Sequence, residues 1–173
     1  MVRRHKQRGS PIAVIDNTLL TRLVRLDIAK FLPLLFKQIL IPPEVKREAY
    51  KAPHKGKRAL RKLIKEMSGF FVDCYEDDEG VKLILKADLD EGEAAAIAQA
   101  DYTGSVLLLD EKAGFKRASV MQLRVMRTTN LLNELKKAGA IAEVKPYYQK
   151  LAKTGFYLKG SVLQHLLAEV GEE

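Results

Sequence analysis

The sequence predicts a single α/β domain: a three-layer α/β/α sandwich with helices on both faces of a central, mainly parallel sheet. Short apolar runs that suit buried strands alternate with segments whose apolar residues recur at helical spacing. The chain has 173 residues, enough for one domain with a substantial core but cramped for two. Its composition, 47% hydrophobic and 30% charged, is that of a globular protein.

The first half of the chain alternates between the two patterns. Residues 12–15 form an apolar run that predicts a buried strand, and a helical pattern begins at Leu19. A second short strand is expected at 39–41. Pro43 then opens a helix, because proline is tolerated in the first helical turn. A basic helix is expected over 55–67, with its leucines on one face.

The second half repeats the alternation. Residues 70–72 predict a third strand, and the alternating residues 81–85 predict a strand that pairs with it across an acidic turn. An alanine-rich helix over 94–100 then leads to a strand over 106–109. The remaining expected elements are a helix over 113–120, a strand over 123–125, a helix over 129–137 capped by Gly139, and a helical extension over about 143–171 with helices at 144–153 and 161–170.

The net charge of +8 favours polyanionic partners, which could be RNA, DNA or an anionic membrane surface. Residues 1–10 are expected to be a flexible basic tail before a domain over 11–173. Its basic residues are Arg3, Arg4, Lys6 and Arg8. The apolar stretches are too short to span a membrane. The lone Cys74 allows no internal disulfide, so we expect an intracellular, cytoplasmic protein.

Four carboxylates mark a candidate site: two follow predicted strands, and two lie on helix faces that should be apolar. Asp16 and Asp110 each follow a predicted buried strand, and ligands bind beyond the carboxyl ends of parallel strands. Glu93 shares a helix face with apolar residues, and Glu48 likewise leans toward the core. Buried carboxylates are costly unless they are paired, protonated or bound to a cation. A cluster of carboxylate oxygens suits Mg²⁺ or Mn²⁺.

Each of these acids also has an ordinary structural interpretation. Asp16 and Asp110 could cap the helices that follow them, and Glu93 could favour a helix dipole. For any single acid the structural interpretation is the better one. The order strand-Asp, helix-Glu, helix-Glu, strand-Asp is much harder to attribute to capping.

At these positions the chain resembles the PIN-domain family. The matching segments are Val14-Ile-Asp16-Asn-Thr18-Leu-Leu, Leu40-Ile-Pro-Pro-Glu-Val-Lys-Arg-Glu48, Leu89-Asp-Glu-Gly-Glu93-Ala-Ala-Ala-Ile-Ala and Leu107-Leu-Leu-Asp110-Glu111. The resemblance runs from about residue 12 to residue 155. It is closest to a subgroup of uncharacterised nucleic-acid-binding proteins in which Gly-Glu-Ala-x-Ala-Ile is characteristic.

The resemblance implies a metal-dependent nuclease with Asp16, Glu48, Glu93 and Asp110 as ligands of Mg²⁺ or Mn²⁺. It also implies supporting roles for Thr18, Glu111 and Thr128. Asn17, Glu111 and Arg127 depart mildly from the family pattern, which leaves the ligand set intact. Phosphodiester hydrolysis agrees with such a site, because metal ions activate water and neutralise phosphate charge without a side-chain nucleophile.

The basic helix offers a candidate surface for the phosphate backbone. Its candidate nucleic-acid-binding residues are Lys55, Lys57, Arg58, Arg61, Lys62 and Lys65. For any one of these residues, a solvated helix face is an equally good interpretation.

Three functions are consistent with these features. The first is a Mg²⁺/Mn²⁺-dependent endoribonuclease acting on RNA. It could be the toxin of a toxin–antitoxin pair, with an antitoxin protein and a second copy of the chain as candidate partners. The second is a non-catalytic RNA-binding module in RNA or ribosome processing. The third is a receiver-like phosphoacceptor domain, which would need a Lys after a late strand, where residues 123–127 offer only Arg.

Overall fold

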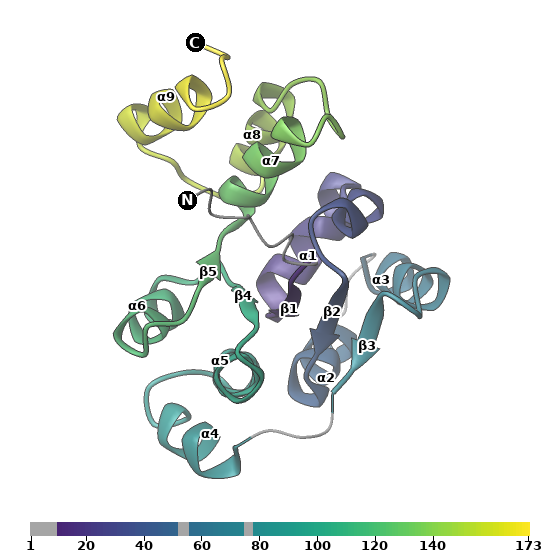
Figure 1. Cartoon of the computed structure of the whole chain (residues 1–173), viewed down its shortest axis with the longest axis vertical. Coiled ribbons are helices and arrows are strands. Elements are labelled where there is room, and N and C mark those ends of the chain that lie inside the picture. The colour runs from purple at the N-terminus through teal and green to yellow at the C-terminus, as the bar shows by residue number, and fades with distance from the viewer. Residues whose placement is uncertain (1–9, 52–55, 75–77) are drawn as a thin grey trace, which may run out of the picture.

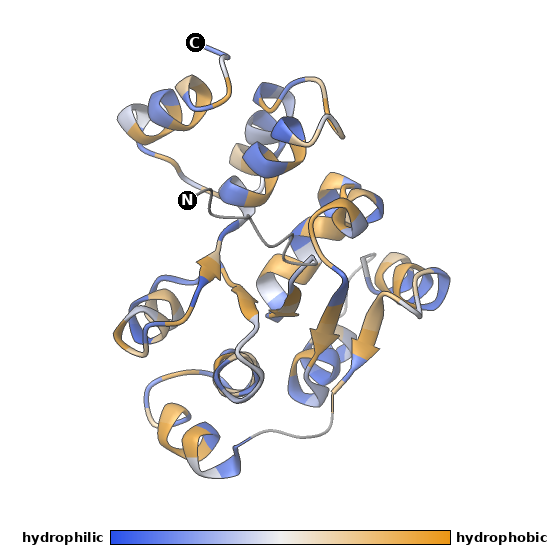
Figure 2. Cartoon of the chain, in the orientation of Figure 1, coloured by the Kyte–Doolittle hydropathy of each residue, from blue (hydrophilic) through white to orange (hydrophobic). Residues whose placement is uncertain are grey.

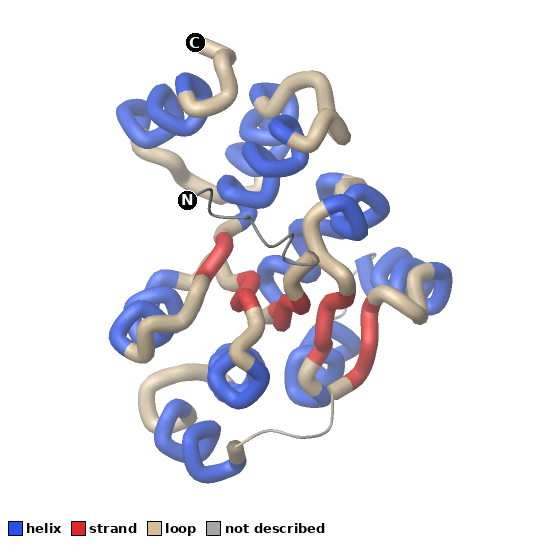
Figure 3. The backbone as a smooth tube through the Cα atoms, viewed as in Figure 1, coloured by secondary structure: helices blue, strands red, loops and turns tan. Residues whose placement is uncertain are grey.

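A parallel sheet forms the centre of the computed structural model, which describes residues 10–51, 56–74 and 78–173. Within these residues, five strands lie in the order β3-β2-β1-β4-β5, and every neighbouring pair is parallel. The strands are β1 (Ile12–Ile15), β2 (Gln38–Ile41), β3 (Phe71–Asp73), β4 (Val106–Leu108) and β5 (Val125–Met126). Figure 3 shows them as a central group surrounded by helices.

Helices cover both faces of this sheet, as Figure 1 shows, and the predicted α/β sandwich is confirmed. The helices are α1 (Asn17–Leu26), η1 (Ala29–Leu34, a 3₁₀-helix), α2 (Pro43–Lys51), α3 (Gly56–Glu66), α4 (Glu79–Leu85), α5 (Glu91–Thr103), α6 (Lys112–Val120), α7 (Thr128–Lys137), α8 (Lys145–Ala152) and α9 (Gly160–Ala168). The last two are extra C-terminal helices. No helix in the described part of the chain is long and apolar enough to cross a membrane.

The strand order brings two distant strand ends together. The chain first builds outward from β1 to β2 and β3, then returns across the sheet to place β4 on the other side of β1. Ile15 pairs with Leu108, and the N–H of Asp16 donates to the carbonyl of Leu108 at 3.1 Å. The carboxyl ends of β1 and β4 therefore form the switch point of the sheet, where ligands bind in open α/β folds.

The core lies between the sheet and the helices packed on it. Figure 2 shows the apolar strands at its centre, and Val14, Ile15 and Leu107 are fully buried. Helix α1 turns its leucines inward, as its helical spacing predicts. Helix α5 is buried over Gly92–Ala100 and contacts β1, β4, α2, α4 and α6. Its run of alanines allows neighbours to approach it from several sides.

The expected strand over 81–85 is wrong, because these residues form α4. The carboxylate of Asp78 caps this helix by accepting hydrogen bonds from the N–H groups of Gly80 (3.0 Å) and Val81 (3.1 Å). Leu85 is buried one helical turn after the half-buried Val81. Leu83, which completed the alternating pattern, is 72% exposed. The basic residues at positions 3–8 and Lys55 lie outside the described residues.

Candidate metal centre

Asp16 lies at the carboxyl end of β1 and is almost completely buried. It is also the N-cap of α1, where its carboxylate accepts a hydrogen bond from the N–H of Leu19 at 2.9 Å. Burial raises the pKa of Asp16 to about 7, and the nearby charges of Asp110 and Glu93 act in the same direction. The capping interpretation is therefore correct for Asp16, but a cap alone does not explain an acid placed among other buried acids.

Asp110 follows β4 and is held by α7 and α1 rather than by the helix after it. Its Oδ1 accepts a hydrogen bond from the N–H of Thr128 at 2.8 Å, and its Oδ2 accepts one from the hydroxyl of Thr128. Arg22 of α1 forms an ion pair with Oδ2. The N-cap of α6 is Glu111, whose side chain makes no capping hydrogen bond. Asp110 is thus not the cap of the following helix, and Thr128 fixes its orientation.

Glu93 lies in the first turn of α5 and turns toward this pair of acids. Its backbone N–H donates to the carboxylate of Asp90, the helix N-cap, at 2.8 Å. Its buried Oε1 lies against Gly114 of α6, whose backbone N–H lowers the pKa of Glu93 without forming a well-aligned hydrogen bond to this oxygen. Burial raises the pKa of Glu93, as do the charges of Asp90 and Glu111. A buried carboxylate oxygen without a well-aligned donor is costly, and a cation would satisfy it.

Glu48 reaches the same end of α5 from α2. It is half-buried, and its Oε1 accepts a hydrogen bond from the N–H of Gly92 at 2.8 Å. Burial and the charges of Asp90 and Glu91 raise its pKa. A Cβ at Gly92 would overlap with the Glu48 carboxylate, so this close approach requires glycine. Gly92 therefore links the two glutamates that the sequence placed on separate helices.

The four acids gather unevenly. Asp16, Asp110 and Glu93 interact through their charges, whereas Glu48 is engaged mainly with the N-terminus of α5. Among the described residues, no three acid, histidine or cysteine side chains are spaced to hold one metal ion. The donor set nevertheless suits a hard cation: its groups are carboxylates, the charges of Asp110 and Glu93 raise the pKa of Asp16, and Glu93 Oε1 lacks a well-aligned donor.

The supporting residues differ in their contacts. Thr128 is fully buried and holds Asp110, as described above. Thr18 lies in the first turn of α1, where its backbone lowers the pKa of Asp16 against the larger effect of burial. Glu111 is exposed and acts on Glu93 through its charge. Arg127 donates to the Asp110 carbonyl at 2.9 Å.

Arg22 is the residue that the sequence reasoning missed. Besides pairing with Asp110, its guanidinium lies 4.6 Å from the ring centre of Phe156, in the segment between α8 and α9. A signal was present, because Thr18, Arg22 and Arg25 share one face of α1 at positions i, i+4 and i+7. That face lines a cleft.

The cleft has a volume of about 590 Å³, and its lining begins at Asn17, the residue after Asp16. Polar and basic side chains from α1, α3 and the end of α8 line it, including Asn17, Thr18, Arg22, Arg25, Lys57 and Thr154. Of the predicted basic residues of α3, only Lys57 lines this cleft. The others are exposed: Arg58 and Lys65 on the outer face, Arg61 against the ring of Tyr50, and Lys62 beside Glu66.

These features define a parallel α/β domain that brings acidic side chains to the switch point of its sheet. A family model described as "PIN domain" matches residues 12–172, and the chain therefore belongs to the PIN-domain family. PIN domains are generally nucleases that use divalent metals and commonly bind nucleic acids.

One solved structure similar to this chain is a domain of a functionally unknown protein from Methanocaldococcus jannaschii DSM 2661. The two are 21% identical with a TM-score of 0.50, over 68% of this chain and 91% of the other. This similarity supports the fold. No curated protein matches the chain.

Proposed function

We propose that this protein is a cytoplasmic, Mg²⁺- or Mn²⁺-dependent endoribonuclease, with Asp16, Glu48, Glu93 and Asp110 as metal ligands. The observation that supports this most strongly is the burial of Asp16 beside Asp110 and Glu93, with the pKa of Asp16 raised to about 7. Burial of the Asp16 charge, together with repulsion from Asp110 and Glu93, destabilises the protein unless a cation offsets both. Oε1 of Glu93, which is buried without a well-aligned donor, could bind such a cation.

The chain's own residues would orient the ligands. Thr128 fixes both oxygens of Asp110, Leu19 fixes Oδ1 of Asp16, and Gly92 fixes Glu48. Such outer partners keep ligating carboxylates in position. When bound, the metal supplies an activated water and neutralises charge on the phosphate.

Cleavage by an Asp16→Asn variant tests the ligand assignment. Asparagine caps helices as well as aspartate does, so α1 should keep its N-terminal hydrogen bond. We expect Mn²⁺-dependent cleavage of a labelled single-stranded RNA to fall more than about 100-fold, the upper end for residues that only orient ligands. The metal-free melting temperature should not fall, since repulsion is relieved.

Asp78→Asn is the matched control, because Asp78 caps α4 in the same way outside the carboxylate site. It should cleave RNA like the wild type. An Asp16→Asn enzyme that cleaves at the wild-type rate would show that Asp16 is only a cap.

The basic cleft that begins at Asn17 supports RNA as the substrate, and its salt dependence can be measured. For single strands, each lost phosphate contact lowers the slope of log affinity against log salt by about 0.7. Replacing Arg25 and Lys57 by Ser should therefore reduce the slope by about 1.4. The control replaces Arg58 and Lys65, which are exposed on α3. A change of slope only in the control would place the strand on the outer face of α3.

The alternative function, a non-catalytic RNA-binding module, also has an observation in its favour. Two of the four acids already have partners within the protein. Asp110 forms an ion pair with Arg22, and one oxygen of Glu48 accepts a hydrogen bond from the backbone N–H of Gly92. Titration calorimetry with Mn²⁺ separates the two proposals: a protein that binds RNA but no Mn²⁺ is the binding module.

A role as a toxin requires an antitoxin protein, which a neighbouring small open reading frame would supply. Light scattering tests the proposed homodimer.

A further inference from the structure

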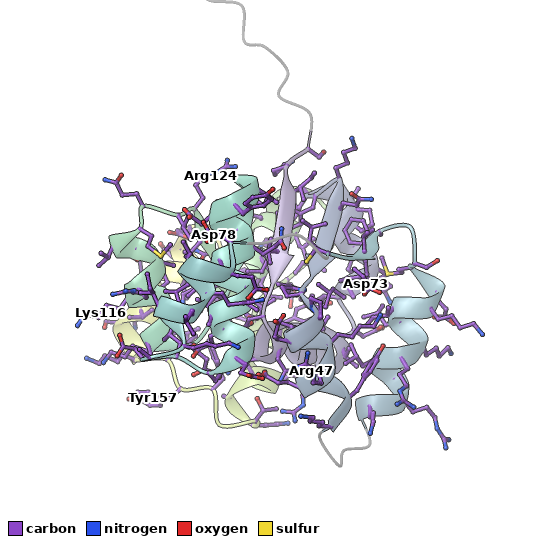
Figure 4. All side chains as sticks on the ribbon, turned by 90° about the horizontal axis from the view of Figure 1, so that it is seen from below. Arg47, Asp73, Asp78, Lys116, Arg124 and Tyr157 are labelled. Atoms are coloured by element: carbon purple, nitrogen blue, oxygen red, sulfur yellow. The ribbon has the colours of Figure 1, made fainter. Side chains whose placement is uncertain are left out.

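A second cleft lies between α8, α9 and the segment that joins them. Its volume is about 680 Å³, within the range of small-molecule sites. Aromatic and aliphatic side chains form most of its wall, with Lys145 and Gln149 as polar members. Tyr157 is 83% exposed, and Figure 4 shows it at the edge of the molecule. A large aromatic ring on the wall of an open apolar cleft is available for stacking on a flat ligand.

This cleft is connected to the carboxylate site through two side chains. Phe156 lines the cleft, and the guanidinium of Arg22 lies 4.6 Å from the centre of its ring. Arg22 in turn forms the ion pair with Asp110. A ligand in the cleft would therefore lie only two side chains away from the proposed metal ligands.

The surface between the cleft and the carboxylates is basic. A smaller hollow of about 90 Å³ is lined by Arg22, Arg25, Lys150 and Thr154. Arg22, Arg25 and Thr154 also line the cleft that begins at Asn17. Cations and hydroxyl groups thus connect an apolar, aromatic cleft to a site of acids. A basic surface next to an apolar, aromatic cleft is complementary to a nucleic-acid strand, whose phosphates are anionic and whose bases are flat and apolar on their faces.

We propose that the cleft between α8 and α9 binds one base of a single-stranded RNA next to the cleaved phosphate, with Tyr157 and Phe156 stacked on its ring. Arg22, Arg25 and Lys150 hold the neighbouring phosphates. The strand is single, because a base must leave its helix to enter an apolar cleft. An apolar peptide would also fit the walls, but the cationic surface that continues from the cleft favours a polyanion. The inference rests on the proposed function and names its substrate contact.

Tryptophan fluorescence gives a direct test, since the chain contains no tryptophan. Tyr157→Trp places one fluorophore on the cleft wall, and Tyr102→Trp is the matched control. Tyr102 is also exposed, at 57%, but lies in the last turns of α5, away from both clefts. With EDTA present to prevent cleavage, adding an oligouridylate should quench the emission of the Tyr157→Trp variant and leave that of the Tyr102→Trp variant unchanged.

Affinity measurements complete the test. By fluorescence anisotropy, Tyr157→Ala should weaken binding of a short RNA about tenfold, as expected for one lost stacking contact, and Tyr102→Ala should not. A single abasic nucleotide, moved along the oligonucleotide, should reduce wild-type affinity most at one position. In Tyr157→Ala that position-specific loss should disappear.

The outcomes separate this inference from the function on which it rests. Absence of RNA binding by the wild type would overturn both. If the wild type binds RNA normally but the emission of the Tyr157→Trp variant does not change, only the base site is overturned. The same follows if the Tyr157→Ala variant binds RNA as tightly as the wild type. Light scattering on the same variants adds one further outcome. A wild-type dimer that Tyr157→Ala converts to a monomer would make the cleft an interface between copies and would also overturn the base site.

Discussion

Helix α2 carries two glutamates one turn apart, Glu44 and Glu48, whose surroundings differ in charge. Glu44 accepts a hydrogen bond from Lys82 at 3.0 Å, and both side chains are largely buried. Burial alone would raise the pKa of Glu44, but the bond and charge of Lys82 outweigh it, and the pKa is lowered. Glu48 faces Asp90 and Glu91 instead, and its pKa is raised.

Glu44 therefore belongs to an ion pair that stabilises the fold, whereas the acids at the switch point destabilise it. Around Glu44, two carboxylates share the buried Lys82, which also contacts Glu79 at 2.8 Å. At the switch point, Arg22 is the cation paired with Asp110, while burial and neighbouring carboxylates raise the pKa of Asp16 and Glu93. Unfavourable charge placed at the ligand-binding edge of a sheet indicates a function that uses the charge.

The largest expected effect comes from neutralising one acid in each region. The variant at the switch point should lose activity but keep its stability, and the variant at Glu44 should lose stability but keep its activity. Glu93→Gln should reduce metal-dependent cleavage more than about 100-fold, with little loss of metal-free stability. Glu44→Gln should leave cleavage unchanged and cost about 1–3 kcal/mol of unfolding free energy, because it weakens the partnering of a buried lysine. Cleavage assays and urea denaturation of the same preparations measure both.

Glu91→Gln provides a control for charge at the start of α5, since Glu91 is exposed and pairs with Arg47 across the surface. It should alter neither property strongly. A fully active Glu93→Gln enzyme would remove Glu93 from the metal site and leave it a dipole residue.

The pH dependence of stability should also differ between the two regions. The folded pKa of Asp16, about 7, exceeds its ordinary value of 3.8, so the folded state binds more protons between these values. The metal-free protein should therefore lose stability as pH rises from about 4 to 7, by up to about 4 kcal/mol. Glu44 acts oppositely: its lowered pKa gives stability that is lost on acidification.

Urea unfolding at pH 5 and pH 8 in EDTA measures this, and Asp16→Asn should flatten the curve. Metal affinity should change in the complementary sense. Mn²⁺ competes with the proton on Asp16, so its affinity should increase up to about pH 7 and then level off. A wild-type protein whose stability does not change between pH 5 and 8 would contradict the burial of an acid with a raised pKa.

The fold was predictable where a pattern depends on local physics. Burial on both faces makes β1 and β4 continuous apolar runs, and alternation with helices indicates parallel strands. The strand prediction over 81–85 failed because the same apolar residues fit both the two-residue period of a strand and the four-residue spacing of a helix. Val81 and Leu85 fit both patterns, and the capping by Asp78 decides in favour of the helix.

The site was predictable only in part, because its neighbours come from distant segments. Acids at strand ends could be placed from strand order alone. The partner of Asp110 lies 88 residues earlier in the sequence, on a helix where arginine is unremarkable. Likewise, nothing local indicates that Phe156 packs against Arg22. Which of the four acids bind metal remains a prediction.

The smallest expected effect concerns Gly92, which allows Glu48 to approach α5. An alanine Cβ there would lie within 3.0 Å of three atoms of the Glu48 carboxylate group, so that group must move. The backbone itself need not shift, because the carboxylate is the end of a flexible side chain. Alanine also favours a helix by up to about 1 kcal/mol relative to glycine. Stability should therefore change little or increase slightly.

Mn²⁺ affinity, by contrast, should fall roughly tenfold, within the range found when residues that orient metal ligands are changed. Gly160→Ala is the matched control: it is also in a helix first turn, and a Cβ there meets open space. Calorimetry and thermal melting of both variants separate orientation from stability. If Gly92→Ala binds Mn²⁺ like the wild type, Glu48 is not held in place for a metal, and its raised pKa reflects only its burial beside the acids of α5.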